Sequence, residues 1–211
     1  MSYVAPVFAR ALAAEPEAQE GVTATRILDA TLHEAAATGL RRLAIEDVAR
    51  RARVSRVTVY RHFGQREQLI EAMAVRETRR FIETMREAVS ESLNVEEQGA
   101  EVFVAGLRFM RAHPVARRAI ESEPEAIVQY LAEEDGLLFG MGREFVAGWL
   151  RRAGVNRRDT DACAETIMRL FVSFLVLPQS VVELADDDAA RAYVRTCIAP
   201  IVASPARRRS R

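Results

Sequence analysis

The first third of the chain carries apolar residues every three or four positions, which is the spacing of one face of an α-helix. The stripe over Thr23–Thr38 consists mainly of alanine, leucine and isoleucine, and Gly39 supplies a C-terminal stop. A second, short helix is predicted over Ile45–Ala52. Ser55 is a suitable N-cap for a third short helix, which the pattern ends near Phe63–Gly64. The pattern therefore predicts three helices with short connections.

The rest of the chain continues with helical spacing. A long helix is predicted from Glu67 to about Ser92. Pro124 is typical of the first turn of a further helix, and Pro200 is expected to end the last one. No longer segment alternates with the period of a strand, and the β-branched residues around Val57–Val59 fit one helical turn better. The later apolar stripes lie at 102–110, 127–131, 137–150, 163–174 and 190–201. The chain is therefore predicted to be all-α.

The composition is typical of a folded protein that is not embedded in a membrane. Apolar residues make up 49% and charged residues 28% of the 211 residues, which excludes a disordered chain. The longest apolar run, Ile167–Leu177, is shorter than the roughly 18 residues of a membrane helix. The two cysteines, Cys163 and Cys197, have no CxxC spacing and fit a reducing compartment. We therefore expect a cytoplasmic protein with no secretory signal and no membrane partner.

Positive charge is concentrated in one short segment. All thirty basic residues are arginine, and they balance thirty acidic residues over the whole chain. Between Arg41 and Arg66 there are eight arginines and only two acidic residues, Glu46 and Asp47, so this segment has a net charge of +6. A basic island of this kind is typical of a surface that binds a polyanion, although a merely solvated face would show the same charge.

The second and third predicted helices are separated by only two or three residues around Arg53–Val54. Two short helices joined by so tight a turn and packed on a longer one form a helix-turn-helix, whose second helix fits the DNA major groove. That second helix carries Arg56 and Arg61, which can reach guanine edges or phosphates. Hydrogen-bond donors for phosphates are provided by Thr58, Tyr60 and His62, and the side chains expected to face the core are Val54, Val59 and Phe63. This division of apolar and polar positions favours DNA binding over a solvated helix.

The stretch at 27–73 reads ILDATLHEAAATGLRRLAIEDVARRARVSRVTVYRHFGQREQLIEAM. It resembles the N-terminal DNA-binding domain of the TetR (tetracycline-repressor-like) family of bacterial transcriptional regulators. Its most specific part is VSRVTVYRHFGQREQL, and the remainder of the chain shows no recognisable sequence match. The resemblance implies a homodimer that binds a palindromic double-stranded DNA operator, most often as a repressor. It also implies release from DNA by a small hydrophobic effector.

The resemblance implies roles for individual residues. Ser55 is expected to cap the recognition helix, and Arg56 stands at the family's usual basic contact. Val57 and Arg61 face the groove in such an arrangement and are, together with Arg56, the predicted base readers. Arg66 stands where the family usually has lysine, close to a phosphate. The expected DNA contacts are Arg42, Ser55, Arg56, Val57, Thr58, Tyr60, Arg61, His62 and Arg66.

Three positions depart from the family's pattern. Arg53 stands where the family usually has glycine, and a non-glycine residue with positive φ costs on the order of 1 kcal/mol. Ala44 replaces the Ser or Thr that usually caps the second helix, and Ala35 replaces a common aromatic residue in the first. None of the three faces the groove, so they bear on local stability more than on DNA binding.

The resemblance also implies an organisation for the whole chain: an N-terminal three-helix helix-turn-helix domain joined by a long helix to a C-terminal helical ligand-binding and dimerisation domain. The expected segments are a disordered arm at 1–20, the helix-turn-helix domain at 21–66, the ligand-binding and dimerisation domain at 67–203 and a basic tail at 204–211.

The two apolar helices near Ala162–Leu177 and Ala190–Ile201 are the expected dimer surface, as half of a four-helix bundle. The residues predicted to form it are Ile167, Leu170, Phe174, Tyr193, Val194, Cys197 and Ile198. The predicted lining of an apolar ligand pocket is Phe103, Leu107, Met110, Tyr130, Phe139, Met141, Phe145, Trp149, Phe171 and Phe174. Ordinary intrachain core is the alternative for both sets. Arg169, alone in an apolar helix, is interpreted as buried and paired with an acid, in preference to a ligand anchor.

An enzyme is not expected, because the chain has no GxxxxGK, HExxH or GxSxG motif. His33, His62 and His113 lie far apart and lack ligand spacing, so no metal or other cofactor is expected. The alternative to a DNA-binding regulator is a helical protein-interaction module without DNA binding, which the irregular Arg53 and Ala44 would permit.

Overall fold

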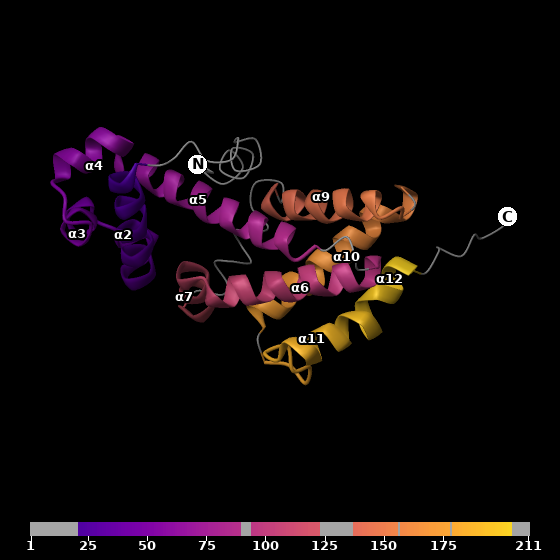
Figure 1. The fold of residues 1–211 in the computed structure, drawn as a ribbon. Coiled ribbons are helices and arrows are strands. Elements are labelled where there is room, and N and C mark those ends of the chain that lie inside the picture. The colour runs from indigo at the N-terminus through magenta and orange to yellow at the C-terminus, as the bar shows by residue number, and fades with distance from the viewer. Residues whose placement is uncertain (1–20, 90–93, 123–136, 156, 178, 204–211) are drawn as a thin grey trace. The chain divides into compact units, whose positions relative to one another are not determined.

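The computed structural model describes residues 21–89, 94–122, 137–155, 157–177 and 179–203 (Figure 1). Within these ranges the chain forms helices joined by turns, with no strand, so the all-α prediction is confirmed. Contacts divide the chain into two compact units. The first, here called the N-terminal unit, consists of residues 1–82 and 111–126, and the C-terminal unit consists of residues 83–110 and 127–211.

The first three helices of the N-terminal unit agree with those predicted from the apolar spacing, whereas the helix at Pro114–Ser122 was not predicted. A 3₁₀ turn at Leu40–Arg42 is added between the first and second helices. The helices are α2 (Val22–Thr38), α3 (Ile45–Arg51), α4 (Arg56–Phe63), most of α5 (Arg66–Glu87) and α7 (Pro114–Ser122). The prediction that the long helix runs to about Ser92 is wrong, because α5 ends at Glu87. There the Val89 N–H donates to the Arg86 carbonyl at 3.1 Å, one residue closer along the chain than an α-helical bond.

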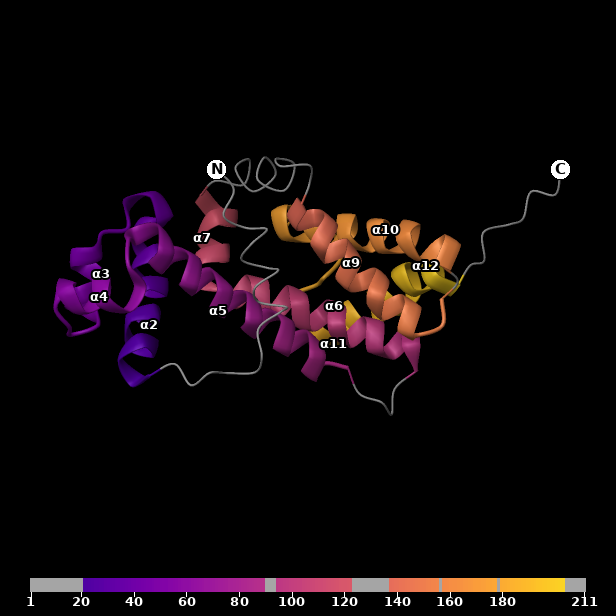
Figure 2. The same ribbon diagram turned by 90° about the horizontal axis from the view of Figure 1, so that it is seen from above.

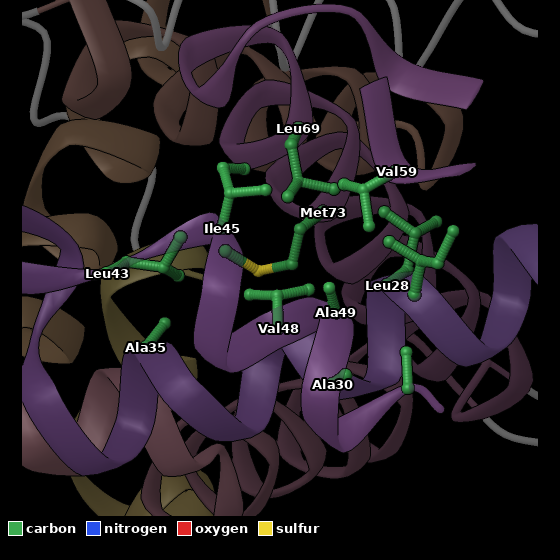
Figure 3. Packing of buried hydrophobic residues seen from close by; sticks show 12 residues of the cluster. Leu28, Ala30, Ala35, Leu43, Ile45, Val48, Ala49, Val59, Leu69 and Met73 are labelled. Carbon is green, nitrogen blue, oxygen red and sulfur yellow. The ribbon is translucent and has the colours of Figure 1, made fainter. Parts of the chain in front are cut away.

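The core of the N-terminal unit is small and built from aliphatic side chains and alanine (Figure 3). Leu28, Val48, Val59 and Leu69 come from α2, α3, α4 and α5 and are fully buried. Fully burying one such side chain contributes about 1.5–3 kcal/mol. Ala35 is also fully buried, so the light core that the sequence predicts at this position is present. The core therefore ties the two short helices to the two longer ones.

The C-terminal unit is assembled from longer helices. α9 and α10 lie side by side and make the most extensive contact between any two helices (Figure 2). The helices are most of α6 (Val95–Ala112), α9 (Leu137–Arg152), α10 (Arg157–Val176), α11 (Asp187–Tyr193) and α12 (Ala199–Ala203). The helix predicted after Pro124, with its stripe at 127–131, lies outside the described residues.

Two glycines of α6 are in close contact with aromatic rings of neighbouring helices. A Cβ on Gly99 would lie 2.9 Å from Cη2 of Trp149 on α9, and a Cβ on Gly106 would lie 2.9 Å from Cε2 of Phe171 on α10. Real Cβ atoms do not approach neighbouring atoms this closely, so only glycine lets the rings reach the helix backbone. Phe171 also meets Phe103 edge to face, with ring centroids 5.6 Å apart. Aromatic rings in glycine notches thus pack α6 against both neighbours.

The last helical segment differs from the prediction at Pro200. A π-helical turn, Val194–Ile198, follows α11, and Pro200 lies inside α12. The expectation that Pro200 ends the helix is therefore wrong. Proline lacks an N–H group and crowds the preceding turn, but its place in the first turn of α12, directly after the wider π turn, avoids both costs.

Candidate nucleic-acid interface

The connection between α3 and α4 is a tight, fully hydrogen-bonded turn. The Val54 N–H donates to the Ala49 carbonyl at 3.0 Å, and the Arg53 N–H donates to the Arg50 carbonyl at 3.2 Å. This pair of bonds is the Schellman motif, which needs a left-handed residue directly after the helix cap. Arg53 is that residue, with φ of +53°, and among the described residues it is the only non-glycine with positive φ. Arg53 thus adopts the left-handed conformation that the motif requires, despite the steric strain this causes for a residue with a side chain.

A guanidinium group from α2 also holds this turn. Arg26 donates to the Ala52 carbonyl and, at 3.5 Å, to the Arg53 carbonyl. Ala44, at the start of α3, provides no side-chain cap, as its identity predicts. The end of α3 is therefore fixed by hydrogen bonds, and its start is fixed by the burial of Ile45.

α4 begins with the predicted cap. The Ser55 Oγ accepts a hydrogen bond from the Thr58 N–H at 3.1 Å, and lies 2.9 Å from the Thr58 hydroxyl. Val59 points into the core with no exposed surface. Val57, by contrast, is 75% exposed although it is apolar, and it shares its face with Arg61 one turn later. A helix anchored by one face therefore presents a mixed apolar and cationic face to solvent.

The predicted DNA contacts separate by exposure. Arg42, Ser55, Arg56, Val57, Tyr60, Arg61 and His62 are exposed, and Thr58 and Arg66 are half-buried. The structure thus places six of the nine along the solvent-facing side of α4 or at its cap, with Thr58 beside the cap. Arg42 lies in the 3₁₀ turn, and Arg66 opens α5.

Arg66 is held by the protein itself. Its guanidinium donates to the carbonyls of Leu43 at 2.9 Å, Arg41 at 3.2 Å and Leu40, and it lies 3.3 Å from the Glu67 carboxylate. These carbonyls end the 3₁₀ turn and would otherwise lack partners. Arg66 therefore has a structural role that the sequence comparison did not indicate, and its phosphate contact stays a prediction.

The eight arginines of the basic island fall into two groups. Besides Arg66, Arg50 pairs with Asp47, Arg51 with Glu34 at 2.5 Å, and Arg56 with Glu46 at 2.9 Å. The remaining four have no acidic partner among the described residues; they are Arg41, Arg42, Arg53 and Arg61. Charges without local partners are the ones most available to a polyanion.

Arg56 is paired with an acidic residue on the exposed side of the motif. The neighbouring Tyr60 side chain, followed by the charge of Glu46, raises the pKa of Arg56 above its ordinary value. The guanidinium is thus permanently charged and oriented at the start of the recognition helix.

α7, more than fifty residues downstream of α4, also belongs to the N-terminal unit. Arg118 donates to the carbonyls of Ala36 at 3.4 Å and Ala37 at 3.1 Å, in the last turn of α2, which has no basic residue of its own. His113 Nδ1 accepts the Ala116 N–H at 3.2 Å at the start of α7, and its Nε2 lies 3.4 Å from the Glu77 carboxylate. Sequence reasoning missed these contacts, because no local spacing links residues so far apart.

The described residues predicted to line a pocket all lie in the C-terminal unit. Phe103 and Leu107 are buried, and Met110, Phe139, Phe145, Trp149, Phe171 and Phe174 are half-buried. Tyr130 and the side chain of Met141 lie outside the described residues. The contacts of Trp149 and Phe171 with the α6 glycines show that at least these two rings pack between helices.

The residues predicted for a dimer surface are similarly divided. Val194 and Ile198 are buried within the single chain. Such burial is expected if these two positions belong to the ordinary intrachain core. Phe174 and Tyr193 meet edge to face at 5.5 Å. Cys197 is exposed, and Ile167 and Leu170 are half-buried.

Arg169 has the ion-pair partner that the sequence interpretation favours. Its Nη2 lies 2.6 Å from the Glu165 carboxylate, and its guanidinium covers the ring of Phe139 at 5.3 Å from the centroid. The side chain is 71% exposed, so the expectation that it is buried in an apolar surface is wrong. Its long stem lets the charge reach solvent.

No group of His, Cys, Asp or Glu side chains within the described residues could hold a metal ion. In the same ranges, no helix combines the length and the apolar character needed to cross a membrane.

Comparisons with known proteins agree with this geometry. α3, the turn and α4 form a helix-turn-helix, and the comparisons support a protein that binds DNA and regulates transcription. Residues 27–73 match the sequence model of the bacterial regulatory proteins of the tetR family. The match spans α2, α3, α4 and the start of α5, so this part of the chain is similar to the DNA-binding domain of that family.

Several solved structures have a similar fold. A TetR-like transcriptional regulator from Rhodococcus sp. RHA1 has a TM-score of 0.61 and 19% identity, over 91% of this chain and 100% of that one. The TetR family repressor AlkX from Dietzia sp. strain DQ12-45-1b, implicated in biodegradation of n-alkanes, has a TM-score of 0.57 and 24% identity, over 84% and 96%. The fatty acid degradation regulator FadR from Bacillus halodurans has a TM-score of 0.60 and 16% identity, over 92% and 100%. None of the curated proteins has a significant match to the sequence.

Proposed function

We propose that the protein is a cytoplasmic, homodimeric repressor that binds a palindromic DNA operator through α4. The observation that carries this proposal is the division of α4 into a buried Val59 face and an exposed face with Val57 and Arg61. A two-turn helix contacts only a few base pairs, so one copy discriminates poorly among genomic sites. Two copies related by a twofold axis read half-sites about one helical turn, roughly 34–36 Å, apart.

The contacts divide into two kinds in this proposal. Val57, with its exposed methyl groups, suits the C5-methyl of thymine, and Arg61 suits the N7 and O6 acceptors of guanine. Thr58, Tyr60 and His62 donate to phosphates, which position the helix without reading sequence. Arg42 adds a phosphate contact from the 3₁₀ turn.

The proposal is tested by selecting a binding consensus from random duplexes. Arg61→Ala is expected to change the consensus and to cost about 1–3 kcal/mol of binding free energy on the wild-type site. Tyr60→Phe is the matched control, because it removes a phosphate donor and should weaken all sequences alike. An Arg61→Ala consensus identical to that of the wild type would contradict the base-reading role.

The salt dependence of binding to random duplex separates this function from the alternative, a protein-interaction module. A dimer that neutralises several phosphates loses affinity steeply as salt rises. A module without DNA binding would show no affinity for duplex DNA at low salt.

The C-terminal unit is proposed to dimerise through α10 and the α11–α12 segment and to bind a hydrophobic effector. The aromatic residues between its helices support an apolar ligand. Two regulators of similar fold are named for n-alkane and fatty acid degradation, which supports ligands with long hydrocarbon chains. Release of the selected operator by a fatty acid, and a dimer mass in sedimentation equilibrium, are the expected results.

A further inference from the structure

The exposed pair of Glu46 and Arg56 joins the two helices of the motif across their DNA-facing side. Glu46 lies in the first turn of α3 and Arg56 opens α4, with 2.9 Å between Oε1 and Nη1. This ion pair restricts the direction of Arg56 while 56% of its side chain remains exposed.

This arrangement differs from the arginines that stabilise the N-terminal unit. Arg26, Arg66 and Arg118 donate to backbone carbonyls at helix ends, which would otherwise lack partners. The Glu46–Arg56 pair satisfies no backbone group, and an exposed ion pair of this kind contributes little to stability. The pair instead fixes the direction of a flexible side chain.

A guanidinium has five N–H donors, so binding to Glu46 leaves donors for a base edge. Arginine reads guanine by donating to N7 and O6 together, which requires a defined orientation. A side chain already held in that orientation loses less conformational freedom when it binds. A freely rotating arginine would bind any nearby phosphate as readily as it binds a guanine edge.

We propose that Glu46 is a positioning residue that gives the Arg56 contact its selectivity for guanine. The inference rests on the proposed function, because it requires α4 to lie in the major groove. The carboxylate of Glu46 repels phosphates of every sequence alike, whereas its hold on Arg56 favours only the matching base. Glu46 thus lowers affinity for random DNA and raises discrimination, two effects that a merely structural residue would not separate.

Asp47 provides a matched control on the same helix. It carries the same charge one residue later and pairs with Arg50, which lies on α3 and not on the recognition helix. Asp47→Asn removes the same charge from the basic island without releasing Arg56. Glu46→Asp keeps the charge but shortens the side chain by one methylene, so it should release Arg56 without relieving phosphate repulsion.

The experiment compares consensus selection and competition binding for the wild type, Arg56→Ala, Glu46→Gln, Glu46→Asp and Asp47→Asn. Arg56→Ala identifies the base pair that Arg56 reads. At that base pair, Glu46→Gln and Glu46→Asp are expected to lose discrimination about fivefold or more, the lower end of one bidentate contact. Glu46→Gln and Asp47→Asn should both bind random duplex more tightly, and Asp47→Asn should keep the full preference. Glu46→Gln in the Arg56→Ala background should cause no further loss.

The proposal is overturned if Glu46→Gln keeps the full preference, if Asp47→Asn loses as much, or if Arg56→Ala leaves the consensus unchanged. Failure of the proposed function looks different, because the wild type itself would then yield no consensus and no salt-dependent binding. Thermal unfolding of each variant checks folding, and these surface substitutions are expected to leave the unfolding midpoint close to that of the wild type.

Discussion

The two units of this protein are stabilised in different ways. The N-terminal unit has a small aliphatic core, and guanidinium groups such as those of Arg26, Arg66 and Arg118 complete its helix ends. In the C-terminal unit, aromatic rings such as those of Trp149 and Phe171 sit on glycines of α6. The first unit is therefore specified by residue identities at fixed spacing, and the second by the fit of shapes between helices. The match to the family model lies within the first unit.

The largest effect is expected in the C-terminal unit, for Gly106→Ala. The added Cβ would lie 2.9 Å and 3.2 Å from two ring atoms of Phe171 and 3.5 Å from the Met85 sulfur. Overpacking of this kind costs about 1–3 kcal/mol of unfolding free energy. Urea unfolding measures this change. If the ring of Phe171 packs tightly on Gly106, the stability lost by overpacking must exceed the stability gained from the higher helix propensity of alanine.

Gly148→Ala is the matched control within α9. Its Cβ would meet only the mobile end of Arg152, at 3.6 Å. Replacing glycine with alanine inside a helix is then expected to stabilise by about 0.5–1 kcal/mol. Equal stabilisation by both substitutions would show that the notch at Gly106 is not tight.

An intermediate effect is expected in the N-terminal unit, for Arg53→Gly. Glycine adopts φ of +53° without the steric cost of a side chain, so the unfolding free energy should rise by about 1 kcal/mol. Arg53→Ala removes the same charge but keeps the strain, and thermal unfolding should separate the two variants. Equal stability of the glycine and alanine variants would show that the turn does not strain Arg53.

The smallest effect is expected from pH, through the ion network around Glu77. Burial alone would raise the pKa of this carboxyl, but the hydrogen bond from His113 and the charges of Arg80 and Arg76 outweigh it and lower the pKa. The unfolded chain therefore takes up the proton first as the pH falls. Stability is fully present above the ordinary value of 4.5 and is lost as the pH falls through the lower folded value.

Urea unfolding at several values between about pH 5 and about pH 3 measures this loss. Glu77→Gln has no carboxyl to protonate, so its unfolding free energy should depend less on pH over that range. Identical pH profiles of the two proteins would show that the network does not stabilise the charged carboxyl.

Local sequence by itself determined the first three helices and the face of α4. Ser55 caps α4, Val59 enters the core and Arg61 points outward, because these outcomes depend on spacing within a few residues. The positive φ at Arg53 follows equally from the short connection. The family could be named from the same stretch, because its residues lie together in the chain.

Tertiary structure decided which charges have partners and how the apolar helices fit together. Arg66 donates to carbonyls 23 to 26 residues away, and Arg118 to carbonyls 81 and 82 residues away. The depth at which Phe171 meets Gly106 depends on the position of one helix on another. A sequence pattern records which face of a helix is apolar. The partner of that face depends on the path of the chain, because packing and ion pairing act through space and not along the sequence.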